Sequence, residues 1–260
     1  WEYCAQPLEQ LSTADKYSLI GGKDSYAQGM WAAALTAHEG KLYLLINGND
    51  AGGYMLSTDD PEGAWQMQKL ERSYYDPGLL FEGDKVYVAC GIGNIDICEL
   101  DKNLKFKKST TVLRDKPGLE GSHLYKIGDY YYIYATYGGW PSGQAIFRSK
   151  DITGPYVDEA GNTAISTKAI GNNWQSDIGE RLMSSIQWSG NDNANIEVSQ
   201  GHNSAFVDDD GTAYLVYHTR FSGSGEKHEV RVHELLPTAD GWLVAAPYEY
   251  TGTKADKKGY

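Results

Sequence analysis

The sequence predicts an all-β chain folded as a five-bladed β-propeller, and three observations support this prediction. A unit of roughly 40 residues recurs, and each copy contains only short strand-like segments, as propeller blades do. Apolar residues mostly alternate with polar ones, which is the period of a strand rather than of a helix. Turn-forming sequences rich in Asp, Gly and Pro separate these segments. The prediction treats residues 1–260 as a single domain.

Each copy of the repeat begins with a head residue, followed by a short strand, a Gly-centred turn and a Tyr-rich strand. The four heads are Trp31, Asp76, Glu120 and His202, and their turn glycines are Gly40, Gly83, Gly128 and Gly211. Third strands are expected within 52–60, 95–103, 144–151 and 229–237, and the copies close at the aromatic residues Trp65, Phe106, Tyr156 and Trp242. Because equivalent blade positions converge on the axis of a propeller, two carboxyl groups and one imidazole are expected to meet there.

Two stretches depart from the repeat. Residues 161–200 are rich in Asn, Ser and Gly, and we interpret them as a long loop. Within it, Trp174 and Trp188 either face a substrate or cover the side of the propeller. Trp1 resembles the closing aromatic of an earlier blade, so roughly 30–40 residues of an incomplete first blade are expected upstream. A four-bladed propeller is the alternative, but it leaves residues 1–30 without a role.

Composition narrows the class of protein. The 260 residues carry a net charge of −12, which argues against the basic surface that nucleic-acid binding requires. No apolar run approaches the roughly 20 residues of a membrane span. Of the three cysteines, Cys90 and Cys98 either face each other across a hairpin or remain single buried thiols. The oligomeric state is left open.

Asp76 and Glu120 are the most informative pair for chemistry. Two carboxyl groups at equivalent heads of successive blades suit acid and base catalysis on a glycosidic bond. A neighbouring ionised carboxylate would raise the pKa of the group that serves as the acid. The alternative is that Asp76 only starts a turn. His202 is either a core histidine or a residue that helps to hold a hydrated cation. Arg220 either reaches a sugar hydroxyl, orients a carboxylate, or forms a surface ion pair.

The segments that carry these residues resemble glycoside hydrolase family 43, whose members are inverting enzymes on a five-bladed propeller. The sequence YDPGLLFEGDKVYV resembles the blade whose Asp orients and tunes the acid, which corresponds to Asp76. The sequence LEGSHLYK resembles the segment that provides the general acid, which corresponds to Glu120. The sequence GHNSAF resembles the last blade, whose imidazole lies beside an often calcium-filled axial site, and this corresponds to His202. Trp31, His123, Trp140 and Arg220 are assigned to substrate binding.

The resemblance also has departures. The general base of the family is an Asp at the head of the first blade, and neither Asp15 nor Asp24 matches that position. The resemblance favours α-1,5-arabinan as the substrate, with a β-xylosidase or a non-catalytic carbohydrate-binding propeller as alternatives. It implies a secreted or periplasmic protein that acts on an oligo- or polysaccharide, one possible calcium ion on the axis, and no organic cofactor.

Overall fold

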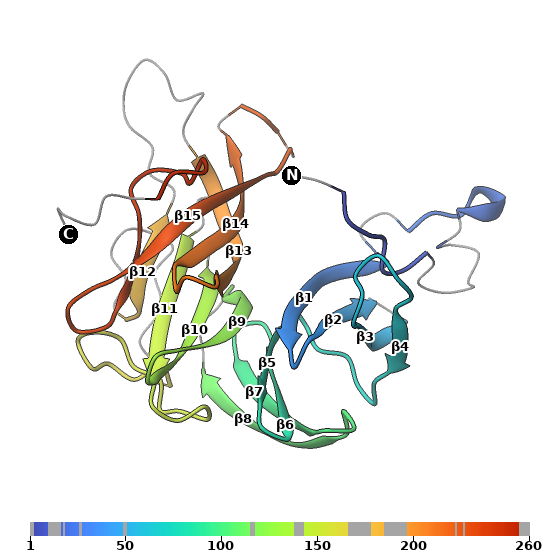
Figure 1. The fold of residues 1–260 in the computed structure, drawn as a ribbon, viewed down its shortest axis with the longest axis horizontal. Helices are drawn as coiled ribbons and strands as arrows, with labels where there is room; N and C mark the ends of the chain where they lie inside the picture. Colours follow the sequence, from blue (N-terminus) through green and yellow to red (C-terminus); the bar gives the residue numbers. More distant parts are fainter. Residues whose placement is uncertain are drawn as a thin grey trace. The chain divides into compact units, whose positions relative to one another are not determined.

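The fold was analysed in a computed structural model of the chain. The structure describes residues 3–9, 17, 19–25, 28–48, 51–114, 118–137, 143–165, 178–184, 197–221, 223–225 and 227–254. These residues form sixteen β-strands and one short 3-10 helix, η1 (Ile20–Gly22) (Figure 1). No helix in these ranges has the length and apolar character that crossing a membrane requires. The all-β prediction is therefore confirmed.

The strands form four sheets of four strands, and in each sheet the spatial order follows the sequence order. This meander is the topology of a propeller blade. The first sheet contains β1 (Met30–His38), β2 (Lys41–Gly48), β3 (Gly52–Thr58) and β4 (Gln66–Lys69). The second contains β5 (Gly78–Glu82), β6 (Lys85–Cys90), β7 (Ile95–Asp101) and β8 (Phe106–Leu113). The third contains β9 (Glu120–Ile127), β10 (Tyr130–Tyr137), β11 (Gly143–Ser149) and β12 (Glu180–Ser184). The fourth contains β13 (Glu197–Val207), β14 (Ala213–Phe221), β15 (Glu229–Pro237) and β16 (Leu243–Ala245).

The chain divides into two compact units. Unit 1 comprises residues 1–91 and 96–110, and unit 2 comprises residues 92–95 and 111–260. Within unit 1, buried residues of the first two sheets share an apolar core that includes Leu45, Met55 and Val88. Within unit 2, the third and fourth sheets share a core that includes Tyr134 and Leu215. Each core buries the inward-facing side chains of two neighbouring blades, as the alternation of apolar residues predicts.

The four predicted turn glycines all lie in the hairpins that join the first and second strands of a sheet. Gly40, Gly83, Gly128 and Gly211 have φ values of +75°, +58°, +58° and +82°. This left-handed conformation costs glycine little, which explains the residue type at these turns. The predicted third strands also coincide with β3, β7, β11 and β15.

The third sheet closes differently from the prediction. Residues 161–200 were expected to form a long loop, but they contribute β12, which pairs with β11 as the fourth strand. Tyr156 is buried and its neighbour Val157 makes only isolated bridges, to Arg148 and Thr163. The unpaired edge of β11 is therefore covered by a segment from further along the chain. A fifth blade is not among the described residues.

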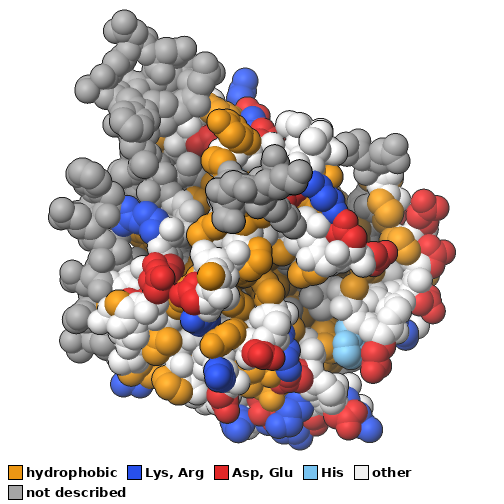
Figure 2. Space-filling view, turned by 60° about the vertical axis from the view of Figure 1, so that its left-hand side comes forward, with side chains coloured by type: hydrophobic (Ala, Val, Ile, Leu, Met, Phe, Trp, Pro, Cys, Tyr) orange, Lys and Arg blue, Asp and Glu red, His pale blue; other side chains and the backbone are white. Residues whose placement is uncertain are grey.

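Cys90 and Cys98 face each other on adjacent strands β6 and β7, with their Sγ atoms 3.8 Å apart. Both are free thiols. On the face shown in Figure 2, acidic and basic side chains are interspersed around groups of hydrophobic ones.

Candidate active site

Glu120 is the first residue of β9, and its surroundings in unit 2 are shaped by the glycine that follows it. Gly121 has a φ of +60°. A Cβ atom at this position would lie 3.2 Å from Thr136 Oγ1 and 3.3 Å from Cγ and Nδ1 of His202. The absence of a side chain therefore allows the His202 ring to lie against the backbone next to Glu120. This contact gives a physical reason for the Glu-Gly pair at the head of the blade.

His202 is held in this position by the neighbouring hairpin. Its backbone N–H donates a hydrogen bond to Thr136 Oγ1 at 2.7 Å. Its φ is +45°, and the pairing of β13 with β14 is irregular on both sides of Gly201. Burial lowers the pKa of His202, while the Glu120 carboxylate acts in the opposite direction. His202 is therefore expected to be neutral at neutral pH, and its ring is close enough to Glu120 for the carboxylate charge to affect its pKa.

His123 lies beside His202, with ring centroids 5.3 Å apart and the rings edge to face. Its side chain is only 5% exposed, and Nδ1 lies 3.0 Å from the Tyr125 hydroxyl. Within the described part of the chain, His123 Nε2 is buried without a hydrogen-bond partner. Burial and then the charge of His202 lower the pKa of His123 to about 3. The ring is thus a neutral group enclosed by protein, and its predicted contact with substrate stays a prediction.

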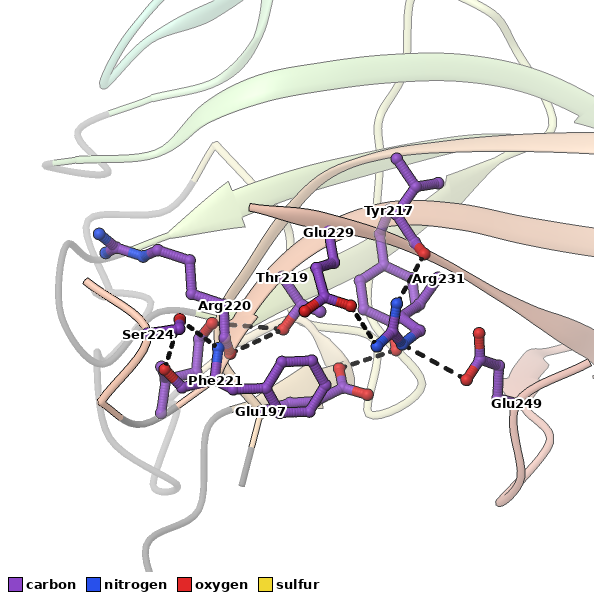
Figure 3. Close-up of polar contacts among 11 residues, drawn as sticks. Glu197, Tyr217, Thr219, Arg220, Phe221, Ser224, Glu229, Arg231 and Glu249 are labelled. Carbon is purple, nitrogen blue, oxygen red and sulfur yellow. Dashed lines mark hydrogen bonds and ion pairs between the residues drawn. The ribbon is translucent and has the colours of Figure 1, made fainter. Parts of the chain in front are cut away.

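Arg220 lies in the same part of unit 2. Its guanidinium donates a hydrogen bond to Ser199 Oγ at 2.8 Å, and Ser199 has a left-handed φ of +57°. Burial, then the charges of His228, His202 and Arg220, lower the pKa of His218 to about 4. Figure 3 shows the Arg220 side chain extending away from the neighbouring cluster around Arg231.

The Arg231 cluster has a different character from the surroundings of Arg220. Arg231 forms ion pairs with Glu229 and Glu249, at 2.6 Å and 3.3 Å (Figure 3). It also lies over the ring of Phe221 at 5.1 Å. These contacts tie β15 to the segment that follows β16, so we assign Arg231 to the structure of the last blade. Arg220 lies in β14, two residues after His218, and its predicted contact with a ligand stays a prediction.

Unit 1 contributes a second group of predicted residues. Asp76 precedes β5, is 9% exposed and has a φ of +46°. Trp31, the second residue of β1, is 42% exposed and meets the ring of Tyr75 edge to face at 6.1 Å. The Tyr75 carbonyl accepts a hydrogen bond from the backbone N–H of Gly91, which anchors the segment before Asp76. The fold therefore gathers a buried carboxyl group and a half-exposed indole around Tyr75.

The outcome for the predicted residues can be stated unit by unit. Unit 2 gathers Glu120, His123, His202 and Arg220, and unit 1 gathers Trp31 and Asp76. Asp24 is exposed and follows η1. The predictions for Asp15, Trp140, Trp174 and Trp188 lie outside the described residues.

Sequence reasoning missed Thr136, which links the Glu120 strand to His202. Thr136 is the partner of Glu120 in the β9–β10 register. The regular β9–β10 register would place Thr136 opposite Gly121, and the irregularity between Tyr134 and Thr136 brings it opposite Glu120, so no sequence pattern pointed to this pair.

The predicted calcium ion can be compared with the groups available. Calcium prefers six to eight oxygen ligands. Among the described residues, no group of three or more His, Cys, Asp or Glu side chains is arranged to hold a metal ion. His202 offers a nitrogen atom rather than an oxygen atom. The described side chains therefore do not fit a calcium ion held directly by protein carboxylates, and an ion beside His202 would have to keep most of its water shell.

Comparisons with known proteins agree with the blade topology. The profile of Glycosyl hydrolases family 43 matches residues 3–243. The extracellular endo-α-(1→5)-L-arabinanase 2 of Bacillus subtilis is 43% identical over 147 residues, covering 52% of this chain and 31% of the relative. The extracellular endo-α-(1→5)-L-arabinanase of Thermotoga petrophila is 30% identical over 230 residues, covering 79% of this chain and 48% of the relative.

A solved structure is similar to this chain over nearly its whole length. The family 43 glycoside hydrolase YxiA of Bacillus licheniformis is 28% identical and superposes with a TM-score of 0.73, covering 98% of this chain and 68% of that one. This chain thus spans less than half the length of the two curated arabinanases. A family profile that covers nearly the whole chain and a shared fold lead to one conclusion: the chain belongs to glycosyl hydrolases family 43.

Proposed function

We propose that this chain is the catalytic propeller of an inverting glycoside hydrolase that cleaves α-1,5-arabinan. The observation that carries the proposal is the arrangement at Glu120, where Gly121 allows a neutral imidazole to pack beside the carboxyl group at the head of a blade. Membership of family 43 supports hydrolysis of a glycosidic bond. Two curated relatives are named endo-α-(1→5)-L-arabinanases, which supports arabinan as the substrate.

In the proposed reaction, Glu120 is the general acid. It donates its proton to the glycosidic oxygen as the bond from that oxygen to the anomeric carbon breaks. A water molecule attacks the anomeric carbon from the opposite face, and a general base accepts the water's proton, so the configuration is inverted. Asp76 is proposed as the second catalytic carboxyl group of the site. We assign the base to no described residue.

Four residues are proposed to bind the sugar. Arg220 offers several N–H donors to sugar hydroxyls, and Ser199 fixes one end of its guanidinium. Trp31 offers a half-exposed indole face on which a sugar ring can pack. His123 and Trp140 complete the proposed set of substrate-binding residues.

Three further parts of the proposal concern the whole protein. We propose a fifth blade in addition to the four sheets, because the resemblance to family 43 implies five. One calcium ion, held through its own water molecules beside His202, is also part of the proposal, and no step of the reaction depends on it. We propose secretion, because the two arabinanase relatives are named extracellular.

The test compares the chain with its Glu120→Gln variant. We expect the variant to keep its thermal stability and to lose about 10²–10⁴-fold in kcat/KM on debranched arabinan, the usual contribution of general acid catalysis. An aryl arabinoside with a good leaving group needs little protonation, so its hydrolysis should suffer less. Equal losses on both substrates would remove Glu120 from the acid role.

Product analysis separates the alternative functions. Release of arabinose oligomers from arabinan supports the proposed substrate, whereas release of xylose from xylo-oligosaccharides would identify a β-xylosidase. Binding of arabinan without any turnover by the unmodified chain would favour the non-catalytic carbohydrate-binding propeller.

A further inference from the structure

Unit 1 contains a cavity of about 360 Å³ that is separate from Trp31 and Asp76. It lies where the outer part of the first sheet meets the end of β5 and the turn between β7 and β8. Phe81 is the lining residue nearest to Asp76 in sequence, and four residues lie between the two. The residues that line the cavity are Tyr43, Met55, Ser57, Gln66, Met67, Gln68, Phe81, Lys102 and Leu104.

The floor of the cavity is apolar. Met55 is fully buried, and the rings of Tyr43 and Phe81 pack against each other with centroids 4.4 Å apart. Tyr43, Phe81 and Leu104 are half-buried and rest on the core that the first two sheets share. This floor is therefore an apolar surface, backed by the core, on which the C–H face of a ligand can pack.

The rim of the cavity is polar. Gln66 and Gln68 of the outer strand β4 contribute two amide groups, Ser57 contributes a hydroxyl and Lys102 contributes an ammonium group. Amides and hydroxyls both donate and accept hydrogen bonds. None of the described lining residues is a carboxylate, although the whole chain carries a net charge of −12. The rim thus suits a ligand with many hydroxyl groups.

The cavity is also preformed. Gln68 Nε2 donates a hydrogen bond to the Asn103 carbonyl at 3.2 Å, which ties β4 to the turn that carries Lys102. Within that turn, Asp101 Oδ1 accepts hydrogen bonds from the backbone N–H groups of Asn103 and Lys105, at 2.9 Å and 3.0 Å. A site that is already ordered loses less entropy when it binds a ligand.

We propose that this cavity is a second carbohydrate-binding site, which holds one or two sugar units of the polysaccharide away from the bond being cleaved. A sugar ring has an apolar face and a polar edge. The cavity matches it with an apolar floor and a rim of amides and hydroxyls, and its volume is at the lower end of the range for small-ligand pockets. Arabinose as the sugar rests on the proposed function, whereas the position of the site does not.

The methionines provide a direct readout of this site. The chain has four methionines, and two of them, Met55 and Met67, line the cavity. Met30 is adjacent to Trp31, and Met183 lies in unit 2. Methyl ¹³C spectra of the Glu120→Gln chain, titrated with arabinohexaose, should show shifts of the Met55 and Met67 signals. Signals of Met55 and Met67 that stay unchanged at saturating arabinohexaose would overturn the proposal.

Matched variants test which residues hold the sugar. In the Gln66→Ala/Gln68→Ala double variant, the midpoint of the Met55 and Met67 shifts should move to at least tenfold higher arabinohexaose concentration. Lys69→Ala, in the same strand but outside the lining, should leave the midpoint unchanged. These three side chains are exposed, so the variants are expected to fold. An unchanged midpoint in the double variant would contradict the proposal.

The two proposals fail separately. If arabinan is not the substrate, the chain will not hydrolyse it, but a sugar in the cavity will still shift Met55 and Met67. If the cavity is not a sugar site, the double variant will bind and hydrolyse arabinan as the unmodified chain does, and the KM for the polymer will not rise.

Discussion

Gly121→Ala tests whether the contact between Gly121 and His202 organises the candidate active site. The substitution has two costs. An L-residue in a left-handed conformation costs about 1–2 kcal/mol, which applies because φ of Gly121 is +60°. The new Cβ would also lie 3.2 Å from Thr136 Oγ1 and 3.3 Å from the His202 ring. Such overpacking typically costs about 1–3 kcal/mol.

Gly128→Ala is the matched control for this substitution. Gly128 lies at the turn of the same β9–β10 hairpin and has a φ of +58°, but nothing lies within 4 Å of the position that its Cβ would occupy. Gly128→Ala should therefore lower the free energy of unfolding only by the cost of the left-handed backbone, about 1–2 kcal/mol. For a chain of this size each kcal/mol lowers Tm by about 2–4 °C, so the two variants should be separable by calorimetry.

The assay combines Tm with kcat/KM on arabinan. We expect Gly121→Ala to lower both, because His202 or Thr136 must move away from Glu120 to make room for the methyl group. Gly128→Ala should lower Tm by the smaller amount and leave kcat/KM within about twofold, since its methyl group points into open space. Equal effects of the two substitutions on Tm and on kcat/KM would refute the reasoning.

Three other predictions concern the same region. Thr136→Val leaves the part-buried backbone N–H of His202 without its acceptor and should cost about 1–3 kcal/mol in urea unfolding, whereas Thr136→Ser should cost less because it keeps the hydroxyl. Burial lowers the pKa of His123 to about 3, whereas its pKa in the unfolded chain is about 6.5. The stability that the neutral His123 ring contributes is therefore complete above pH 6.5 and is lost as the pH falls toward 3. His123→Gln should remove about 1.6 kcal/mol of the stability difference between pH 6.5 and pH 5, measured by urea unfolding at both pH values. If a hydrated calcium ion binds beside His202, dialysis against a chelator should lower Tm. Adding Ca²⁺ at about 100 times its Kd should then restore about 2.7 kcal/mol of unfolding free energy. An unchanged Tm would exclude the calcium ion.

The local features of the fold could be predicted from the sequence because they depend on local chemistry. The alternation of apolar residues predicts the strands. Gly40, Gly83, Gly128 and Gly211 predict the hairpin turns, because the left-handed backbone of these turns costs glycine little. Heads, turns and third strands of the repeat all follow from such short-range signals.

The closing strand of the third sheet could not be predicted in the same way. Residues 180–184 pair with β11 across a separation of more than thirty residues, and their sequence ERLMS shows no clear alternation. What selects this segment is the open edge of β11, which is a property of the folded sheet. The cavity of unit 1 was missed for a similar reason, since its lining comes from β2, β3, β4, β5 and a turn that no single motif connects.

The backbone conformations of the blade heads Asp76 and His202, and of Ser199 beside Arg220, add an independent argument for the role of these residues. Among the described residues, six residues other than glycine have positive φ values, and three of them are Asp76, Ser199 and His202. Such conformations cost about 1–3 kcal/mol and persist where the surrounding structure imposes them, often at functional sites. Glycine would remove this cost at each position, yet the chain has a carboxyl, a hydroxyl and an imidazole group there. Asp76→Gly, Ser199→Gly and His202→Gly should therefore relieve backbone strain while lowering activity, and a variant that gained stability without losing activity would show that its side chain is dispensable.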